Sequence, residues 1–179
     1  MKPRAVPVIR AAGTEDVALL PAVEAASDTL LNGLAEPGSP GVSMVSMGPG
    51  MLPAPAAVPE LAASLHILVA GVPPVGFARI EEVDGQAHLE QLSVHPSAAG
   101  AGLGRRLVES ALQWAREQGY RSMTLCTFAG VPFNAPFYRS CGFVPVDVPQ
   151  GELRALRDHE RQLGLDGLGP RVAMRRVLQ

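Results

Sequence analysis

Hydrophobic positions recur along the chain with two different periods, which predicts a mixed α/β fold. In the middle of the chain, three apolar runs separated by turn residues predict a meander of antiparallel strands over 65–70, 75–83 and 86–94. The last two runs flank Asp84-Gly85, a dipeptide typical of a two-residue hairpin turn. A 3.6-residue period then predicts a helix with one apolar face over 103–118.

The flanking segments continue this succession of strands and helices. We predict strands over 5–10, 123–128, 142–148 and 172–178, and helices over 14–31, 132–140 and 152–163. Thr14 is the expected N-cap of the first helix. The last helix carries charges at i,i+4 spacing, typical of a solvated helix. Because a helix crosses over between 86–94 and 123–128, these two strands are expected to pair in parallel.

Residues 36–59 break the pattern, because they are rich in proline, glycine and methionine and fit no regular element. A loop of this length within a compact domain is typically a lid, a wall of a site or a mobile surface segment. The sequence leaves these alternatives open. A short helix is expected to begin near Val58, with Pro59 in its first turn.

Length and composition indicate one globular domain over residues 1–179, since the apolar content is 47% and the charged content 18%. The net charge of −2 and the absence of a long basic tract argue against a nucleic-acid partner. The start lacks an apolar signal core, and the apolar runs are too short to cross a membrane. Cys126 and Cys141 form neither a disulfide framework nor a metal motif, so a cytoplasmic protein without a metal is expected.

A glycine-rich loop, Ser97 to Gly104, lies between the predicted strand 86–94 and the predicted helix 103–118. Glycines let backbone N–H groups approach a ligand, and the helix N-terminus adds unpaired N–H groups and a positive dipole end. This combination predicts an anion site, most often for phosphate. The loop lacks the Gly-Lys-Ser/Thr of a Walker motif and the spacing of a dinucleotide fingerprint.

The loop does resemble that of the Gcn5-related N-acetyltransferases, in which a strand runs into Gln/Arg-x-x-Gly-x-Gly/Ala and then a helix. Gly102-Leu103-Gly104 matches the glycine pair, and the preceding Gln91-Leu92-Ser93-Val94-His95-Pro96 resembles the family's strand. Ala99 stands where the family has Gln or Arg, a departure expected to weaken coenzyme binding. A later segment, from Val131 through Tyr138 to Cys141-Gly142-Phe143, resembles the family's aromatic-Tyr and Gly-Phe signature.

This resemblance implies a twisted, mainly antiparallel sheet that is splayed at the cofactor site and has helices on both faces. It implies acetyl-CoA as co-substrate and acetyl transfer to a primary amine of a small molecule or peptide, by direct attack in a ternary complex. A non-catalytic acyl-CoA-binding or sensor module is the alternative, and a homodimer is left open. The implied cofactor contacts are Leu92, Ser93, Val94, Ala99, Gly100, Ala101, Gly102, Leu103, Gly104, Arg105, Asn134 and Phe137.

The resemblance also implies proton-transfer roles. Tyr138 stands where the family has a tyrosine that protonates the departing thiolate, although a packing role is open as well. Asn134 is expected either to bind the cofactor or to cap a helix.

The base is less clear, because Gln91 and Thr127 occupy positions where relatives carry glutamate. His88 and Glu90 are the remaining candidates, on one face of the strand unless a bulge intervenes, with proton removal through water as the alternative. Cys126, in an apolar strand, is expected to be inert.

Overall fold

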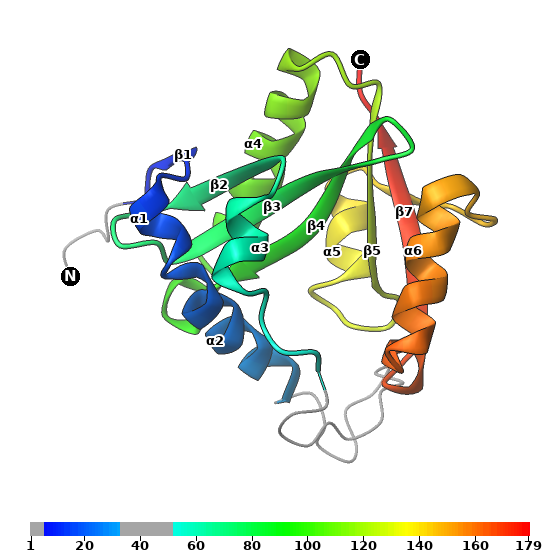
Figure 1. The fold of residues 1–179 in the computed structure, drawn as a ribbon, viewed down its shortest axis with the longest axis horizontal. Helices are drawn as coiled ribbons and strands as arrows, with labels where there is room; N and C mark the ends of the chain where they lie inside the picture. Colours follow the sequence, from blue (N-terminus) through cyan, green and yellow to red (C-terminus); the bar gives the residue numbers. More distant parts are fainter. Residues whose placement is uncertain (1–5, 33–51) are drawn as a thin grey trace.

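A computed structural model describes residues 6–32 and 52–179, which build a seven-stranded sheet in the order β1-β2-β3-β4-β5-β7-β6 (Figure 1). The strands are β1 (Ile9–Ala11), β2 (His66–Ala70), β3 (Gly76–Val83), β4 (Gln86–Val94), β5 (Ser122–Phe128), β6 (Val144–Pro145) and β7 (Arg171–Val177). The helices are α1 (Thr14–Val17), α2 (Leu20–Asn32), α3 (Val58–Ala62), α4 (Leu103–Glu117), α5 (Ala135–Ser140) and α6 (Gly151–Gln162), with short 3-10 helices η1 (Pro96–Ala98) and η2 (Leu165–Gly167). The mixed α/β class predicted from the sequence is confirmed.

The sheet opens between β4 and β5, its parallel pair. These strands pair only through Ala87 with Met123 and His88 with Thr124, and then diverge. On its other side β4 pairs with β3 in antiparallel register, but the register shifts at Glu90, which has no partner opposite it. Such a bulge bends and twists a strand. The bulge and the early end of pairing together produce the predicted splay.

Helices cover both faces of the sheet, as predicted. Alternate residues of β2 face opposite ways, because successive side chains of a strand point to opposite faces. Leu68 packs in the larger core with α4 and α5, whereas Ile67 and Val69 pack in a second core with α1, α2 and α3. On the latter face, η2 and the end of β5 form a third cluster around Phe128.

Several predicted boundaries shift for local reasons. The helix predicted over 14–31 is interrupted, and α2 begins anew with Pro21 as its second residue, where the missing N–H is tolerated. Thr14 is not the N-cap; that position is Gly13, whose N–H donates to the Asp16 carboxylate at 2.7 Å. Two predicted strands are shorter than expected, with regular pairing only over Ile9–Ala11 in β1 and Val144–Pro145 in β6. Residues 36–51, which are most of the loop predicted over 36–59, lie outside the described residues.

Candidate active site

A cavity of about 830 Å³ lies at the opening between β4 and β5. Its wall is built by α2, α3, the loop before α4, α5 and α6, together with the diverging strands. Most of the predicted cofactor residues line it, namely Leu92, Val94, Ala99, Gly100, Gly102, Leu103, Gly104, Arg105, Asn134 and Phe137. The cavity lining does not include Ser93, which is fully buried, or Ala101.

The glycine-rich loop offers an open backbone cradle at one end of this cavity. Gly100 and Gly102 have φ angles of +78° and +73°, a left-handed conformation that favours glycine. A Cβ atom added at either glycine would meet no atom of the described residues within 4 Å. Gly102 is the N-cap of α4, and because glycine has no side chain to cap the helix, the N–H groups of the first turn of α4 stay available. This cradle suits the pyrophosphate of a coenzyme A molecule.

Arg105, in the first turn of α4, adds a positive charge beside the cradle. Its guanidinium donates to the Ser140 carbonyl at 3.1 Å and to the Ser140 hydroxyl at 2.7 Å, which ties α4 to the end of α5. The side chain also lines the cavity. Arg105 therefore supplies a cation, tethered to Ser140, in the wall of the cavity that Ala99 also lines.

Tyr138 lines the cavity from α5 and also packs within the larger core. Its ring makes edge contacts with Phe137 and Phe143, at centroid distances of 5.1 and 5.9 Å. The hydroxyl makes no hydrogen bond to the residues that the structure describes in this region. Burial raises the pKa of Tyr138, so the phenol stays protonated at neutral pH. Asn134 is the N-cap of α5 by position, but its side chain makes no capping hydrogen bond.

The two candidate bases lie in different environments. His88 is 1% exposed and does not line the cavity, and burial lowers its pKa to about 4. Glu90 lines the cavity, and its pKa is raised, mainly by desolvation and less by neighbouring carboxylates. The bulge does not separate them, since His88 Nε2 lies 3.6 Å from Glu90 Oε2. Gln91, at a family glutamate position, instead donates to the Ser93 hydroxyl at 2.8 Å.

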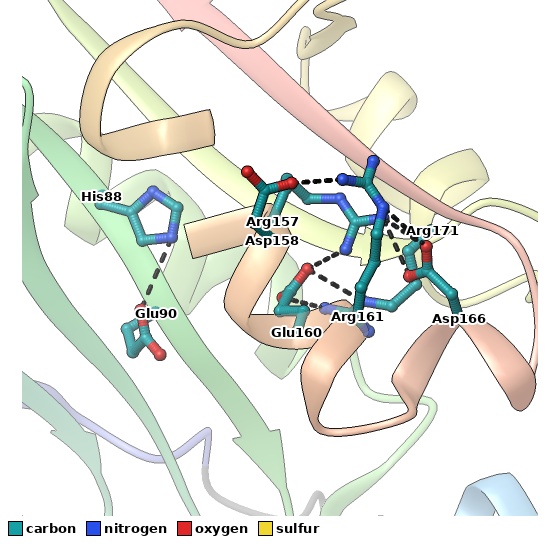
Figure 2. Close-up of polar contacts among 8 residues, drawn as sticks. All are labelled: His88, Glu90, Arg157, Asp158, Glu160, Arg161, Asp166 and Arg171. Carbon is teal, nitrogen blue, oxygen red and sulfur yellow. Dashed lines mark hydrogen bonds and ion pairs between the residues drawn. The ribbon is translucent and has the colours of Figure 1, made fainter. Parts of the chain in front are cut away.

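The sequence did not predict a charged cluster that reaches the cavity wall through Glu160 and Arg171, and Figure 2 shows this cluster together with His88 and Glu90. Arg157 of α6 is 5% exposed and binds Glu160 and Asp166, so α6 is not simply a solvated helix. Arg171 of β7 donates to Glu160 at 2.6 Å and lies over the Phe128 ring. Only the i,i+3 spacing of Arg157 and Glu160 was legible in the sequence, because Arg171 and Asp166 come from other elements.

Acidic side chains of α2 also line the cavity and were not predicted. Desolvation raises the pKa of Asp28 to about 6 and, to a smaller extent, that of Glu24. Cys126 faces the cavity as well, and burial raises the pKa of its thiol to about 12, which keeps it protonated and weakly nucleophilic. The expectation that Cys126 is inert agrees with this environment.

The sequence of the central part of the chain matches a known family. Residues 54–143 match the model of the acetyltransferase (GNAT) family, and the chain belongs to that family. A curated relative is glucosamine 6-phosphate N-acetyltransferase 1 of Oryza sativa subsp. japonica, 35% identical over 95 residues. The match covers 52% of this chain and 55% of the rice protein, so the chain spans about half the length of this relative.

Solved structures share the fold. A Mycobacterium tuberculosis protein in complex with CoA and NLQ is 20% identical, with a TM-score of 0.64 over 97% of this chain and 100% of that chain. The PaiA N-acetyltransferase of Thermoplasma acidophilum, in complex with coenzyme A, is 16% identical, with a TM-score of 0.63 over 96% of this chain and 98% of that chain.

Residues 6–32 and 52–179 contain no group of three or more His, Cys, Asp or Glu side chains placed to hold a metal ion. None of their helices is long and apolar enough to cross a membrane.

Proposed function

We propose that the protein transfers an acetyl group from acetyl-CoA to a primary amine of a small molecule or peptide, by direct attack in a ternary complex. The observation that carries this proposal is that the glycine-rich cradle, Glu90 and Tyr138 all line one cavity at the opening of the sheet. Acetyl-CoA supplies an acetyl group activated as a thioester. The protein supplies binding, orientation and proton transfer.

In the half of the cavity assigned to the cofactor, binding depends on backbone groups rather than on side chains. The free N–H groups at the start of α4 and the open positions at Gly100 and Gly102 support binding of the pyrophosphate. Beyond His88, β4 no longer pairs with β5, so its outward backbone groups are available to the pantetheine arm. Backbone N–H groups at this place are also suited to polarise the thioester carbonyl.

Glu90 is the base that the geometry supports best. The attacking amine must be neutral, and a carboxylate with a raised pKa accepts a proton near neutral pH more readily than an ordinary one. His88 is buried and outside the cavity lining, so it cannot reach an acceptor directly. In the reaction a C–N bond forms and the C–S bond breaks. Glu90 takes the amine proton, and Tyr138 protonates the sulfur.

The acceptor half of the cavity favours a basic molecule with an apolar part. Glu24 and Asp28 offer negative charge along α2, while Leu156 of α6 and Leu163, directly after α6, offer apolar surface. The relatives are named for, or bound to, different molecules. We therefore assign the acceptor to a chemical class, the primary amines. We place the reaction in the cytoplasm, in keeping with the two free cysteines, Cys126 and Cys141.

A non-catalytic acyl-CoA-binding or sensor module is the second candidate function. The observation that favours it is the pair Gln91 and Thr127, which occupy two positions of a family glutamate. Glu90 and Tyr138 favour the enzyme, because a sensor requires neither a base nor a proton donor in its cavity. The two functions share a cofactor site and differ in turnover.

Coenzyme binding is tested by Gly104→Val. Gly104 lies in the first turn of α4, and a Cβ there would make only ordinary contacts with Phe137 and Val94, at 3.8 and 3.9 Å. The larger valine is expected to weaken binding of coenzyme A at least tenfold in calorimetry, because it occupies the cradle. Gly167→Val, at an open position of η2, is the matched control. Unchanged affinity in a folded Gly104→Val protein would contradict the cofactor site.

Turnover is tested by release of free thiol from acetyl-CoA with a panel of amines, including amino sugars, amino acids, polyamines and a peptide N-terminus. Glu90→Gln is expected to lower kcat about 10²-fold without changing the affinity for coenzyme A. Tight coenzyme binding without transfer to any amine would favour the sensor module. A Glu90→Gln protein as fast as wild type would show that another group removes the proton.

A further inference from the structure

The imidazole of His88 is a buried polar group that the proposed reaction does not use directly. It lies on β4 opposite Thr124 of β5, which is the last paired position before the two strands diverge. Its two ring nitrogens are withdrawn from water, and a buried polar group of this kind needs partners. These partners identify which tautomer the His88 imidazole adopts.

Each ring nitrogen faces one polar side chain. Nδ1 lies 2.8 Å from the Thr124 hydroxyl oxygen, which is a hydrogen bond. Nε2 lies 3.6 Å from Oε2 of Glu90, a residue that lines the cavity, and Figure 2 shows this contact as a dashed line. His88 thus connects a buried threonine to the carboxylate that lines the cavity.

These contacts select one tautomer. Burial keeps the ring neutral at neutral pH, so only one nitrogen carries a proton. A proton on Nδ1 would point the lone pair of Nε2 at the Glu90 carboxylate. It would also leave the Thr124 hydroxyl proton without an acceptor among the described residues. A proton on Nε2 removes both conflicts, because Thr124 then donates to Nδ1 and Nε2–H points at Glu90.

We propose that His88 is a positioning residue, held by Thr124 in the Nε2–H tautomer, that orients the carboxylate of Glu90 toward the acceptor amine. The separation of 3.6 Å exceeds a hydrogen bond and shortens to one when the acceptor orders Glu90, as catalytic contacts tighten in ternary complexes. One carboxylate oxygen is then fixed by His88, and the other is free for the amine. The catalytic part of this proposal rests on Glu90 being the base.

The charges around Glu90 set the direction of the effect. Arg79 of β3 favours the ionised carboxylate, whereas Glu81 of β3, Glu60 of α3 and Glu160 of α6 disfavour it. Glu81 and Glu160 face His88 as well. An N–H of His88 that points at Glu90 favours the ionised carboxylate, as Arg79 does. Loss of this N–H donor is therefore expected to raise the pKa of Glu90.

Nuclear magnetic resonance of the protein without ligand tests the contact independently of activity. The ¹⁵N signals of His88 are expected to show a proton on Nε2 and no titration between pH 5.5 and 8, about where an ordinary histidine titrates. His88→Leu removes the donor and is expected to raise the pKa of Glu90, read from its ¹³C carboxyl signal, by about one unit. His88→Gln keeps an N–H donor and is expected to restore the wild-type value.

Thr124→Val provides a second variant that keeps the ring in place. Without the hydroxyl, the tautomer is no longer fixed, so signals of both tautomers and a smaller rise in the pKa of Glu90 are expected. In the active protein, His88→Leu is expected to move the acidic limb of kcat/KM upward by about one pH unit and to lower kcat about tenfold. KM for acetyl-CoA should stay unchanged, and His88→Gln should recover both effects.

A proton on Nδ1, or an unchanged Glu90 titration in both His88→Leu and Thr124→Val, would overturn the proposal. The NMR results separate it from the proposed function. If the tautomer and the Glu90 shift are found but Glu90→Gln retains full activity, the contact stands. In that case the assignment of Glu90 as base fails, and the catalytic role of His88 fails with it.

Discussion

At the scale of single residues, the surroundings of the two candidate bases distinguish them more strongly than their side-chain chemistry does. Histidine has the pKa closest to neutral in model peptides, which made His88 an attractive base in the sequence. In the sheet interior desolvation lowers the pKa of His88 to about 4, whereas at the cavity wall desolvation raises the pKa of Glu90, whose side chain is still 36% exposed. Spacing along a strand identifies a shared face, but not which of its residues reaches the cavity.

Tyr138→Phe tests the proposed proton donor. The change removes one hydroxyl that makes no hydrogen bond to the described residues and leaves the ring packed against Phe137 and Phe143. We expect kcat to fall about 10²-fold because the leaving thiolate loses its acid, with little change in coenzyme affinity. Steady-state kinetics with an accepted amine would measure this. Tyr120→Phe, at a half-buried tyrosine outside the cavity lining, is the control for the loss of a phenol hydroxyl. Equal rates for Tyr138→Phe and wild type would make Tyr138 a packing residue.

Asp16 supports a prediction on acid stability. Its carboxylate accepts from Arg10 at 2.9 Å and from the Gly13 N–H at 2.7 Å, and these hydrogen bonds lower its pKa to about 2. Since the pKa is lower in the folded state than the usual value near 4, the stabilisation is complete above pH 4 and is lost as pH falls toward 2. Asp16→Asn should destabilise the fold by about 1 kcal/mol at pH 7.

Urea denaturation of wild type and Asp16→Asn between pH 7 and pH 2 would measure the difference. The difference in unfolding free energy between the two proteins, called the gap below, should narrow below pH 4. The exposed Asp147, changed to Asn, serves as control and should shift stability by much less. A gap that persists unchanged to pH 2 would contradict the role assigned to the Asp16 carboxylate.

At the scale of secondary-structure elements, the β3–β4 turn is joined to the N-terminus of α6. The Asp84 carboxylate accepts from the Glu152 N–H at 2.8 Å and from the Leu153 N–H at 3.0 Å, while Glu152 accepts from the Asp84 N–H. Asp84 thus caps a helix from a distant part of the sequence. Because α6 carries Glu160 on the cavity wall, this contact helps to fix the shape of the cavity.

Gly151→Ala tests that contact. Gly151 has a φ of +56°, and an added Cβ would collide with the Asp84 carboxylate. We expect a loss of about 1–2 kcal/mol in unfolding free energy, from the lost cap and the backbone strain. Thermal and urea denaturation would measure it. Asp84→Ala should cost a similar amount, and the double variant should cost less than the sum. Full additivity would show that the two residues act independently.

Local signals in the sequence were sufficient for some elements and not for others. β4 begins and ends where predicted, because a hairpin dipeptide precedes it and His95-Pro96 follows it. The bulge at Glu90 left no such signal, since it depends on the register with β3. The glycine cradle could be predicted because it is made by contiguous backbone. The Arg157, Glu160, Asp166 and Arg171 cluster could not, because tertiary folding brings its members together.

At the scale of the whole molecule, the sheet consists of two halves that are joined over a short length. β1 to β4 form one half and β5 to β7 the other, and pairing between them is limited to Ala87 with Met123 and His88 with Thr124 (Figure 1). The buried face of α4 packs against β2, β3, β4 and β5, so α4 also holds the halves together. The cavity lies where neither strand pairing nor α4 closes the gap.

A coenzyme that binds in this gap should therefore stabilise the molecule unevenly. At a hundredfold excess over Kd, ligand binding adds about 2.7 kcal/mol, which corresponds to a rise in Tm of about 5–10 °C for a chain of this size.

Hydrogen exchange should slow most at residues 90–94 of β4, whose outward N–H groups lack β5 as a partner. β2, which pairs on both sides with β1 and β3, should change little beyond the global effect. Mass spectrometry of exchange with and without coenzyme A would measure both regions, and Gly104→Val should reduce the difference at the same coenzyme concentration. Protection spread equally over β2 and β4, or confined to segments away from the opening, would place the coenzyme elsewhere on the molecule.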